Sequence, residues 1–528
     1  MALERSLLIA GSAIQLVMNA AVSSISPYFP TYAGAAYGLT SLESGVIMAA
    51  MPAAGVVFSA PLAALSSRVG RVSMLYVLHR PAAVAATAHS PLPPPLPLPR
   101  YGGILSVSFG SFCWAFASSP IQLFAARLVL GIGCAAEWVA IPALLMEHSS
   151  NFITAIAITE ALAGTGYAAA ATSYYCYYSY YYYYPLTCAP RLPHRYMLGP
   201  TAGGYLFDTM GFRGGALLQA LCTLVFALCV LPVLLRPLVR LHGAGKRAEP
   251  ASDSAALGHG QAALRSRPMV LLGCLNTFSA ICVIGAVEAT YAPHYTALLG
   301  VGASGNGLLF CGTSLTYSIL ATPAAWLSNR FGYRAVMGAG AVFYCASLLL
   351  CDPSIWLGGA YPPAEAPRWL VLSSVVACSL FMGAGIALTW IPSLPLMKTA
   401  LDGDPNASHK MEKIAGLANV ATSLGEALGP FLGGALLQVM PRTVAARCEG
   451  DAPCSTAFAP MISVFAGLMA AVALANAACI PKRLGVSGEA GDELEPLLPS
   501  PDQHQHRDAA KMRLWGSAPG GRRGEVSS

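Results

Sequence analysis

The sequence predicts an all-α integral membrane protein with 12 transmembrane helices in two pseudo-symmetric six-helix halves. The 528 residues are 55% hydrophobic and only 10% charged, whereas soluble domains carry roughly 25% charged residues. Repeated apolar runs reach the ~20 residues that a spanning helix needs, and they lack the alternation of membrane β-barrel strands. The modest net charge of +6 favours no nucleic-acid partner, and the cysteines show no metal-ligand spacing.

A stretch rich in glycine and proline occurs twice inside apolar runs, at equivalent places late in each half. Both copies have the pattern Gly-Pro-x-x-Gly-Gly. Glycine lets helix backbones approach closely, and proline removes a backbone donor and bends a helix. We interpret the copies as gating bends of a duplicated transporter, with simple helix packing as the alternative. Their residues are Gly199, Pro200, Gly203 and Gly204, and Gly425, Gly429, Pro430, Gly433 and Gly434.

The apolar runs define the two halves, residues 1–235 and 268–480. A polar, basic linker at 236–267 joins them, and the polar composition of 481–528 predicts a disordered cytoplasmic tail. The runs of the first half cover 7–28, which ends at two prolines, then 43–65, 72–77 with 101–117, 120–146, a run from 152 that resumes at 198, and 214–235. The runs of the second half cover 268–289, 306–327, 335–350, 369–392, 411–440 and 457–480.

Two foreign stretches, 78–100 and 169–197, interrupt the third and fifth runs. The first is rich in proline, which favours an extended conformation that cannot face lipid as a helix. The second has nine tyrosines within 174–184 and no helical or strand period. Deleting 169–197 restores the Gly-x-x-x-Gly-Pro-x-x-Gly-Gly spacing of the second half. We interpret both stretches as insertions of the kind a retained intron gives; the alternative is two genuine loops that break the helices.

Two short basic turns follow the second and eighth runs. They read Ser-Ser-Arg-Val-Gly-Arg and Ser-Asn-Arg-Phe-Gly-Tyr-Arg. They resemble the loop motif G-x-x-x-D-R-x-G-R of the major facilitator superfamily, which implies that fold. The aspartate is replaced by Ser67 and Asn329, so the charged contact that helps to latch the outward-facing state in that family is absent. The matching residues are Arg68, Gly70, Arg71, Arg330, Gly332 and Arg334.

The distribution of basic residues predicts the topology. Lysine and arginine concentrate in the linker, the tail and the loops after even-numbered runs, whereas the opposite loops hold only Arg213, Arg368, Arg442 and Arg447. This bias predicts a multi-pass protein with both termini in the cytoplasm. Cys448 and Cys454 would then lie on the opposite side, where they are candidates for a disulfide.

Charged residues inside the runs are the candidates for function. Arg127 is the lone cation, and the Arg-x-x-x-Gly-x-Gly that it begins resembles a pattern of proton-coupled superfamily members. We expect it to face the bundle interior, with snorkelling to the interface as the alternative. Glu160 and Glu288 are the best pair for cation recognition and proton exchange, and Glu426 is a candidate for coupling. Glu137 is a fourth carboxylate, ten residues after Arg127 and too far along the helix to pair with it.

Several strings resemble the vesicular amine transporters, solute carrier family 18, most closely the vesicular polyamine branch. They are 26–30, Glu160 upstream of the Gly-x-Gly and Gly-Pro-x-x-Gly-Gly-Tyr-Leu of the fifth run, 315–318 and 391–395, together with a dileucine at 497–498 that resembles an endosomal or vacuolar sorting signal. Monoamine carriers hold an acidic residue in the first helix, where this chain has only Asn19. The resemblance implies a proton-coupled antiporter of organic cations in a vesicular, endosomal or vacuolar membrane.

The expected partners are therefore a small organic cation, protons and the lipid bilayer. We expect a monomer with no cofactor and no enzymatic activity, driven by the proton gradient. The alternatives are a general drug or metabolite proton antiporter of the same fold and a pseudo-carrier that transports nothing.

Overall fold

The computed structural model describes residues 2–69, 103–148, 155, 158–162, 199–235, 268–352, 355, 367–400, 407–440, 457–482 and 484. The chain divides into a helical unit, Met1–Gly485, and a C-terminal unit, Val486–Ser528, which lies outside the described residues. Also outside them are both predicted insertions, the linker, the candidate disulfide of Cys448 and Cys454, and Gly70 and Arg71. The predictions on these segments stay predictions.

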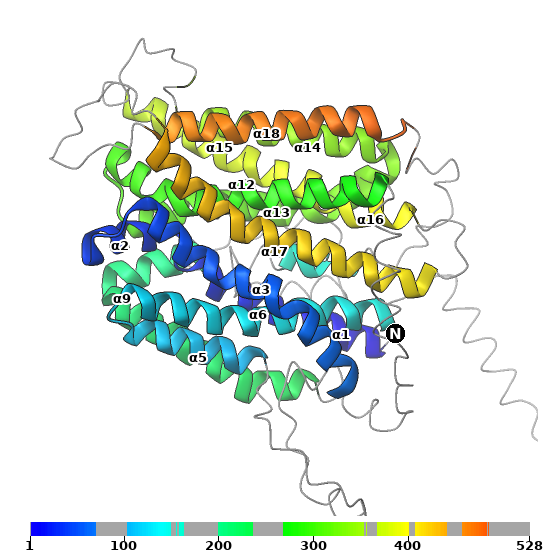
Figure 1. Cartoon of the computed structure of the whole chain (residues 1–528), viewed down its shortest axis with the longest axis horizontal. Coiled ribbons are helices and arrows are strands. Elements are labelled where there is room, and N and C mark those ends of the chain that lie inside the picture. The colour runs from blue at the N-terminus through cyan, green and yellow to red at the C-terminus, as the bar shows by residue number, and fades with distance from the viewer. Residues whose placement is uncertain are drawn as a thin grey trace, which may run out of the picture. The chain divides into compact units, whose positions relative to one another are not determined.

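The described regular elements are all helices (Figure 1). Those of the first half are α1 (Ala2–Ser23), α2 (Phe29–Tyr37), α3 (Ser41–Val69), α5 (Gly103–Phe116), α6 (Pro120–His148) and α9 (Gly199–Val225), which continues into the π-helical turn η2 (Phe226–Val230). Those of the second half are α12 (Pro268–Leu299), α13 (Ala303–Phe331), α14 (Tyr333–Leu350), α15 (Arg368–Trp390), α16 (Ser393–Thr399), α17 (Ala407–Val439) and α18 (Phe458–Cys479).

Ten helices among the described residues are long and apolar enough to cross a membrane. The difference from 12 predicted spans arises in the third, fifth and sixth runs. The described part of the third run is α5, which has only 14 residues. The end of the fifth run and the sixth run follow one another directly in α9 and its extension, which consist of two helices that meet at Gly211, where the backbone is not helical. Gly211 has φ 68°, a left-handed conformation that glycine adopts without strain.

The first predicted run ends earlier than its prolines suggest. Helix α1 ends at Ser23, turns follow to Tyr28, and α2 then begins with Pro30 in its first turn. Proline fits there because the first turn of a helix leaves its backbone donors unpaired. The expected helix over 7–28 was therefore wrong at its end.

The helices pack in two groups that meet along two seams. In the first half α6 packs on α3 and α5, and in the second half α12 packs on α17 while α14 packs on α15 and α18. The seams between the halves are α3 against α17 and α9 against α13 (Figure 1). Each half has its own apolar cluster of buried side chains, and a third cluster joins residues of the first half to Ala289 and Ala303 of the second.

Candidate functional site

Four helical segments bring three carboxylates and one guanidinium within electrostatic range of one another. Arg127 lies on α6, Glu288 on α12 and Glu426 on α17, and Glu160 lies in the described fragment 158–162. Arg127 interacts electrostatically with Glu288 and Glu426, and Glu426 also interacts with Glu160. The structure therefore assembles the sequence-predicted group from both halves of the chain.

Arg127 lies inside the bundle. Its side chain is only 4% exposed, and its Nη2 atom donates to the backbone carbonyl of Met48 at 3.5 Å. Its guanidinium carbon lies 5.9 Å from the ring centroid of Trp114, a cation–π contact. The Nε atom has no hydrogen-bond partner in the structure. A buried cation with an unused donor attracts anionic groups, and Glu288 and Glu426 are the ones in range.

Glu160 contacts aromatic residues of the opposite half. The hydroxyl of Tyr317, on α13, donates to its Oε2 atom at 3.3 Å. The ring of Tyr317 stacks on Trp390 of α15, with centroids 5.8 Å apart and planes at 21°. A carboxylate that adjoins an aromatic pair is a favourable environment for an ammonium group. Sequence reasoning assigned no role to Tyr317 or Trp390, because an aromatic inside an apolar run has the pattern of any core residue.

The other two carboxylates differ in their partners. The hydroxyl of Ser26, in the turns after α1, donates to Glu288 Oε2 at 3.4 Å, so the early end of α1 supplies this contact. Glu426 has one buried oxygen, Oε2, without any hydrogen-bond partner. An unsatisfied carboxylate oxygen inside a bundle is costly unless a proton or a cation binds it. Glu426 is thus the least satisfied member of the group.

The structure does not bring Glu137 to this group. Its side chain is 1% exposed, and its Cγ atom lies on the side of α6 that faces Gly103 of α5. Its Oε1 atom has no hydrogen-bond partner. Glu137 is therefore a buried glutamate of the same helix as Arg127, directed at a different neighbour.

The two adjacent glycines that end each copy of the repeated motif make different contacts. One lies against its own half of the chain, and the other lies against the opposite half. A Cβ added at Gly433 would touch Ala286 of the same half, whereas one added at Gly434 would collide with the carbonyl of Ser41 in the other half. The first copy repeats this division, because Gly203 faces Ser24 of its own half and Gly204 faces Ala303 of the other.

The prolines of the motif also meet glycines across the seams. A Cβ at Gly45 of α3 would collide with the carbonyl of Pro430, and one at Gly307 of α13 would collide with that of Pro200. The internal duplication of the sequence is thus reproduced as a duplicated set of contacts between the halves. Helix packing accounts for the other two glycines of the second copy of the motif, because Gly425 and Gly429 lie against the backbone of α12 at Phe278 and Cys282.

The second basic turn has a clear conformational requirement. Gly332 follows α13 with φ 82° and ψ 154°, a conformation that side chains disfavour, and its N–H donates to the carbonyl of Ser328 at 2.9 Å. Arg330 lies over the rings of Trp326 and Phe331 at 5.4 and 5.8 Å. Arg334 lies in the first turn of α14. In the first copy, Arg68 lies at the end of α3.

Hydrogen bonds join α9 to α13 across their seam, one of them from the Thr201 hydroxyl to the carbonyl of Gly307 at 3.2 Å. Asp208 accepts a hydrogen bond from the backbone N–H of Ser304 at 2.9 Å and another from the Ser304 hydroxyl. Its carboxylate therefore caps the beginning of a helix in the other half, where a negative charge is also favoured by the helix dipole.

Asp208→Ala should loosen the first turn of α13. Loss of a helix cap destabilises by about 1 kcal/mol, so hydrogen exchange of the backbone amides at the start of α13 should quicken roughly fivefold. Asp208→Asn is the matched control, because its amide oxygen still accepts from Ser304. Unchanged exchange in the alanine variant would contradict this role.

Comparisons with known proteins concern the fold. Residues 274–499 match the sequence profile of the Major Facilitator Superfamily. No curated protein matches the chain in sequence. Among solved structures, a crystal structure of a mutant of the nucleoside transporter NupG is similar, with a TM-score of 0.57 and 10% identity over 90% of this chain and 100% of that one. The predicted all-α membrane protein with a major facilitator fold is confirmed, and this fold supports a role in membrane transport.

Proposed function

We propose that this protein is a proton-coupled antiporter that moves an organic cation, a polyamine or a related amine, across a vesicular or vacuolar membrane by alternating access. The observation that carries the proposal is the group of Glu160, Glu288, Glu426 and Arg127, which draws on both halves. Ionisable residues inside a membrane bundle are expensive, and they typically mark the path of a substrate or proton.

The charge balance of this group suits exchange. One carboxylate can offset the charge of Arg127, which leaves two that need protons or bound cations inside the membrane. Protons and the ammonium groups of a substrate therefore compete for the same oxygens. Such competition is what antiport requires, because each occupant must leave before the other binds.

The surroundings of Glu160 favour an amine over other cations. Tyr317 donates its hydroxyl to this carboxylate and stacks its ring on Trp390, so an aromatic pair adjoins the carboxylate and can attract an alkylammonium group. A flexible polyamine could place one ammonium group there and another near Glu288 or Glu426. Each carboxylate would then recognise a separate charge of one substrate molecule.

The contacts of the carboxylates also link recognition to movement. Tyr317 reaches Glu160 across the halves, as Ser26 reaches Glu288. A substrate or proton that takes these acceptors weakens both links, and the halves can then rock about the midplane site. The glycine contacts of α3 with α17 and of α9 with α13 would close one side of the membrane.

Transport assays in proteoliposomes test this proposal. The full chain, and a form without 78–100 and 169–197, should take up radiolabelled spermidine into vesicles with an acidic interior, and a protonophore should abolish the uptake. A radiolabelled nucleoside serves as the comparison substrate, because the similar NupG structure is that of a nucleoside transporter. Accumulation of the nucleoside alone, or of spermidine without a proton gradient, would contradict the proposal.

A further inference from the structure

The second half contains a pair of buried thiols that the transport site does not use. Cys351 follows the end of α14 and Cys378 lies on α15, and they are only 1% and 4% exposed. Their Sγ atoms are 2.9 Å apart. This separation is close to the about 2.05 Å of a disulfide bond, so little movement would join them. We propose that Cys351 and Cys378 form a structural disulfide that fastens α14 to α15.

Two hydrogen bonds fix the backbone beside the two thiols. The hydroxyl of Tyr295, on α12, donates to the carbonyl of Cys351 at 3.0 Å. The hydroxyl of Ser374, one turn before Cys378, donates to the carbonyl of Leu350 at 2.6 Å. These bonds position the end of α14 against α12 and α15, and the approach of the sulfur atoms therefore follows from the backbone arrangement.

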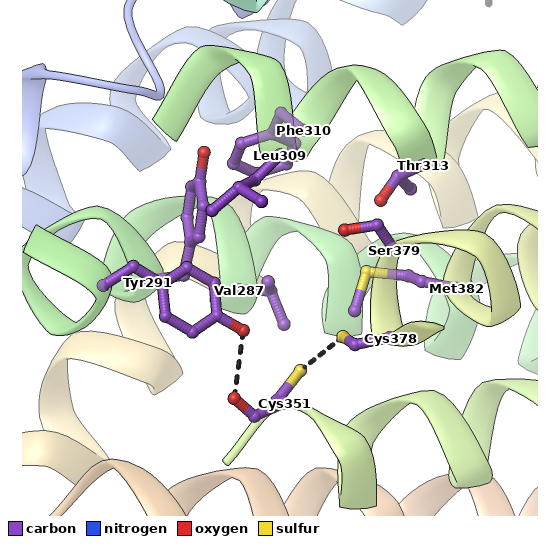
Figure 2. Close-up of a pocket in the computed structure, with 10 residues that line it drawn as sticks. Val287, Tyr291, Leu309, Phe310, Thr313, Cys351, Cys378, Ser379 and Met382 are labelled. Atoms are coloured by element: carbon purple, nitrogen blue, oxygen red, sulfur yellow. Dashed lines mark hydrogen bonds between the residues drawn. The ribbon is translucent and has the colours of Figure 1, made fainter. Parts of the chain in front are cut away.

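A small pocket borders the pair. Figure 2 shows Cys351 and Cys378 at its wall, with Ser379 and Met382 beside them and Tyr291 opposite. By contrast, the thiol of Cys345, earlier on α14, donates to the backbone carbonyl of Ala466. Cys345 thus has a backbone carbonyl as its partner, whereas the sulfur atoms of Cys351 and Cys378 approach each other.

The two cysteines lie near the end of α14 that should face the oxidising side of the membrane. This helix begins at the basic turn with Arg334 and ends at Leu350, so the pair lies at the end opposite the turn. Basic turns favour the cytoplasmic side, and disulfides form in secretory compartments on the other side.

The reaction is a thiol–disulfide exchange. Two thiols lose two protons and two electrons as the sulfur–sulfur bond forms, and the disulfide of a thiol–disulfide oxidoreductase accepts both electrons and is reduced to two thiols. The bond would lie within the second half and away from both seams. It can therefore brace this half without hindering movement of the two halves.

Peptide mapping of the full chain tests the pair directly. The protein is unfolded in N-ethylmaleimide, which blocks free thiols, and digested without reductant. The peptides of Cys351 and Cys378 should appear as one cross-linked species that lacks two hydrogens and carries no maleimide, and dithiothreitol should separate them. Recovery of both peptides as maleimide adducts would overturn the proposal.

Thermal unfolding provides a second test. Dithiothreitol should lower the unfolding temperature of the natural chain by roughly a few degrees. It should do the same to Cys345→Ser, the matched control, and leave the double variant Cys351→Ser with Cys378→Ser unchanged. An equal decrease in all three proteins would count against a bond at this position.

Discussion

The Glu160→Gln variant should lose proton-driven uptake of the organic cation in acidified proteoliposomes. Glutamine keeps the size of the side chain and an oxygen that accepts from Tyr317, but it neither carries a charge nor takes up a proton. A hydrogen bond to a charged group contributes roughly 1.5–3 kcal/mol, which corresponds to at least about tenfold in substrate affinity. Loss of proton exchange should remove the remaining accumulation. Initial rates of spermidine uptake at several substrate concentrations measure both effects.

Glu137→Gln is the matched control for this experiment. Glu137 is also a buried glutamate, yet it faces Gly103 instead of the carboxylate group. Its neutral variant should retain uptake, since it removes a buried charge without touching the proposed site. Full activity of Glu160→Gln, or equal losses in both variants, would refute the assignment of Glu160.

Gly434→Leu and Gly429→Leu should fail in different ways, although the two glycines are five residues apart on α17. A side chain at Gly429 meets the backbone of Cys282 inside the second half, so the variant should be destabilised by about 1–3 kcal/mol or more and express poorly. A side chain at Gly434 meets Ser41 and Leu42 of the other half. That variant should fold, because each half keeps its own packing, and should lose transport because the seam cannot close.

Unfolding temperature and uptake, measured together, separate the two outcomes. The Gly434 variant should keep an unfolding temperature close to that of the natural chain and lose most of its uptake, whereas the Gly429 variant should show a clear decrease in unfolding temperature. Gly204→Leu, which would meet Ala303 across the other seam, should behave like the Gly434 variant. Normal transport by Gly434→Leu would contradict a gating role for this contact.

Much of the fold follows from local patterns. Apolar runs of membrane length predicted the helices, since a chain in lipid must satisfy its backbone hydrogen bonds within each helix. The break between α1 and α2 was missed because Pro30 can end one helix or begin the next, and only the observed first turn of α2 decides between them. The break near Gly211 was expected from the boundary between the fifth and sixth runs, although a single glycine does not reveal its backbone angles in advance.

The candidate site was likewise predicted in part from the sequence and completed only by the tertiary structure. Charged residues inside apolar runs identified Arg127, Glu160, Glu288 and Glu426 as candidates, because such residues are costly there and often functional. Their common location, and the exclusion of Glu137, depend on the direction that each side chain takes from its helix. Likewise, Tyr317 and Trp390 became part of the site only once α13 and α15 placed them beside a residue of the other half.

The sequence by itself determined that the chain lies in a membrane, that its two halves repeat one motif and that a few charged residues lie inside apolar runs. These properties reside in composition and spacing, which need no partner. Only the tertiary structure decided which glycine meets its own half and which meets the other, which carboxylates share one group, and which two cysteines touch. Those pairings join residues far apart in the chain, and helical periodicity specifies the face of one helix but not the helix that packs against it.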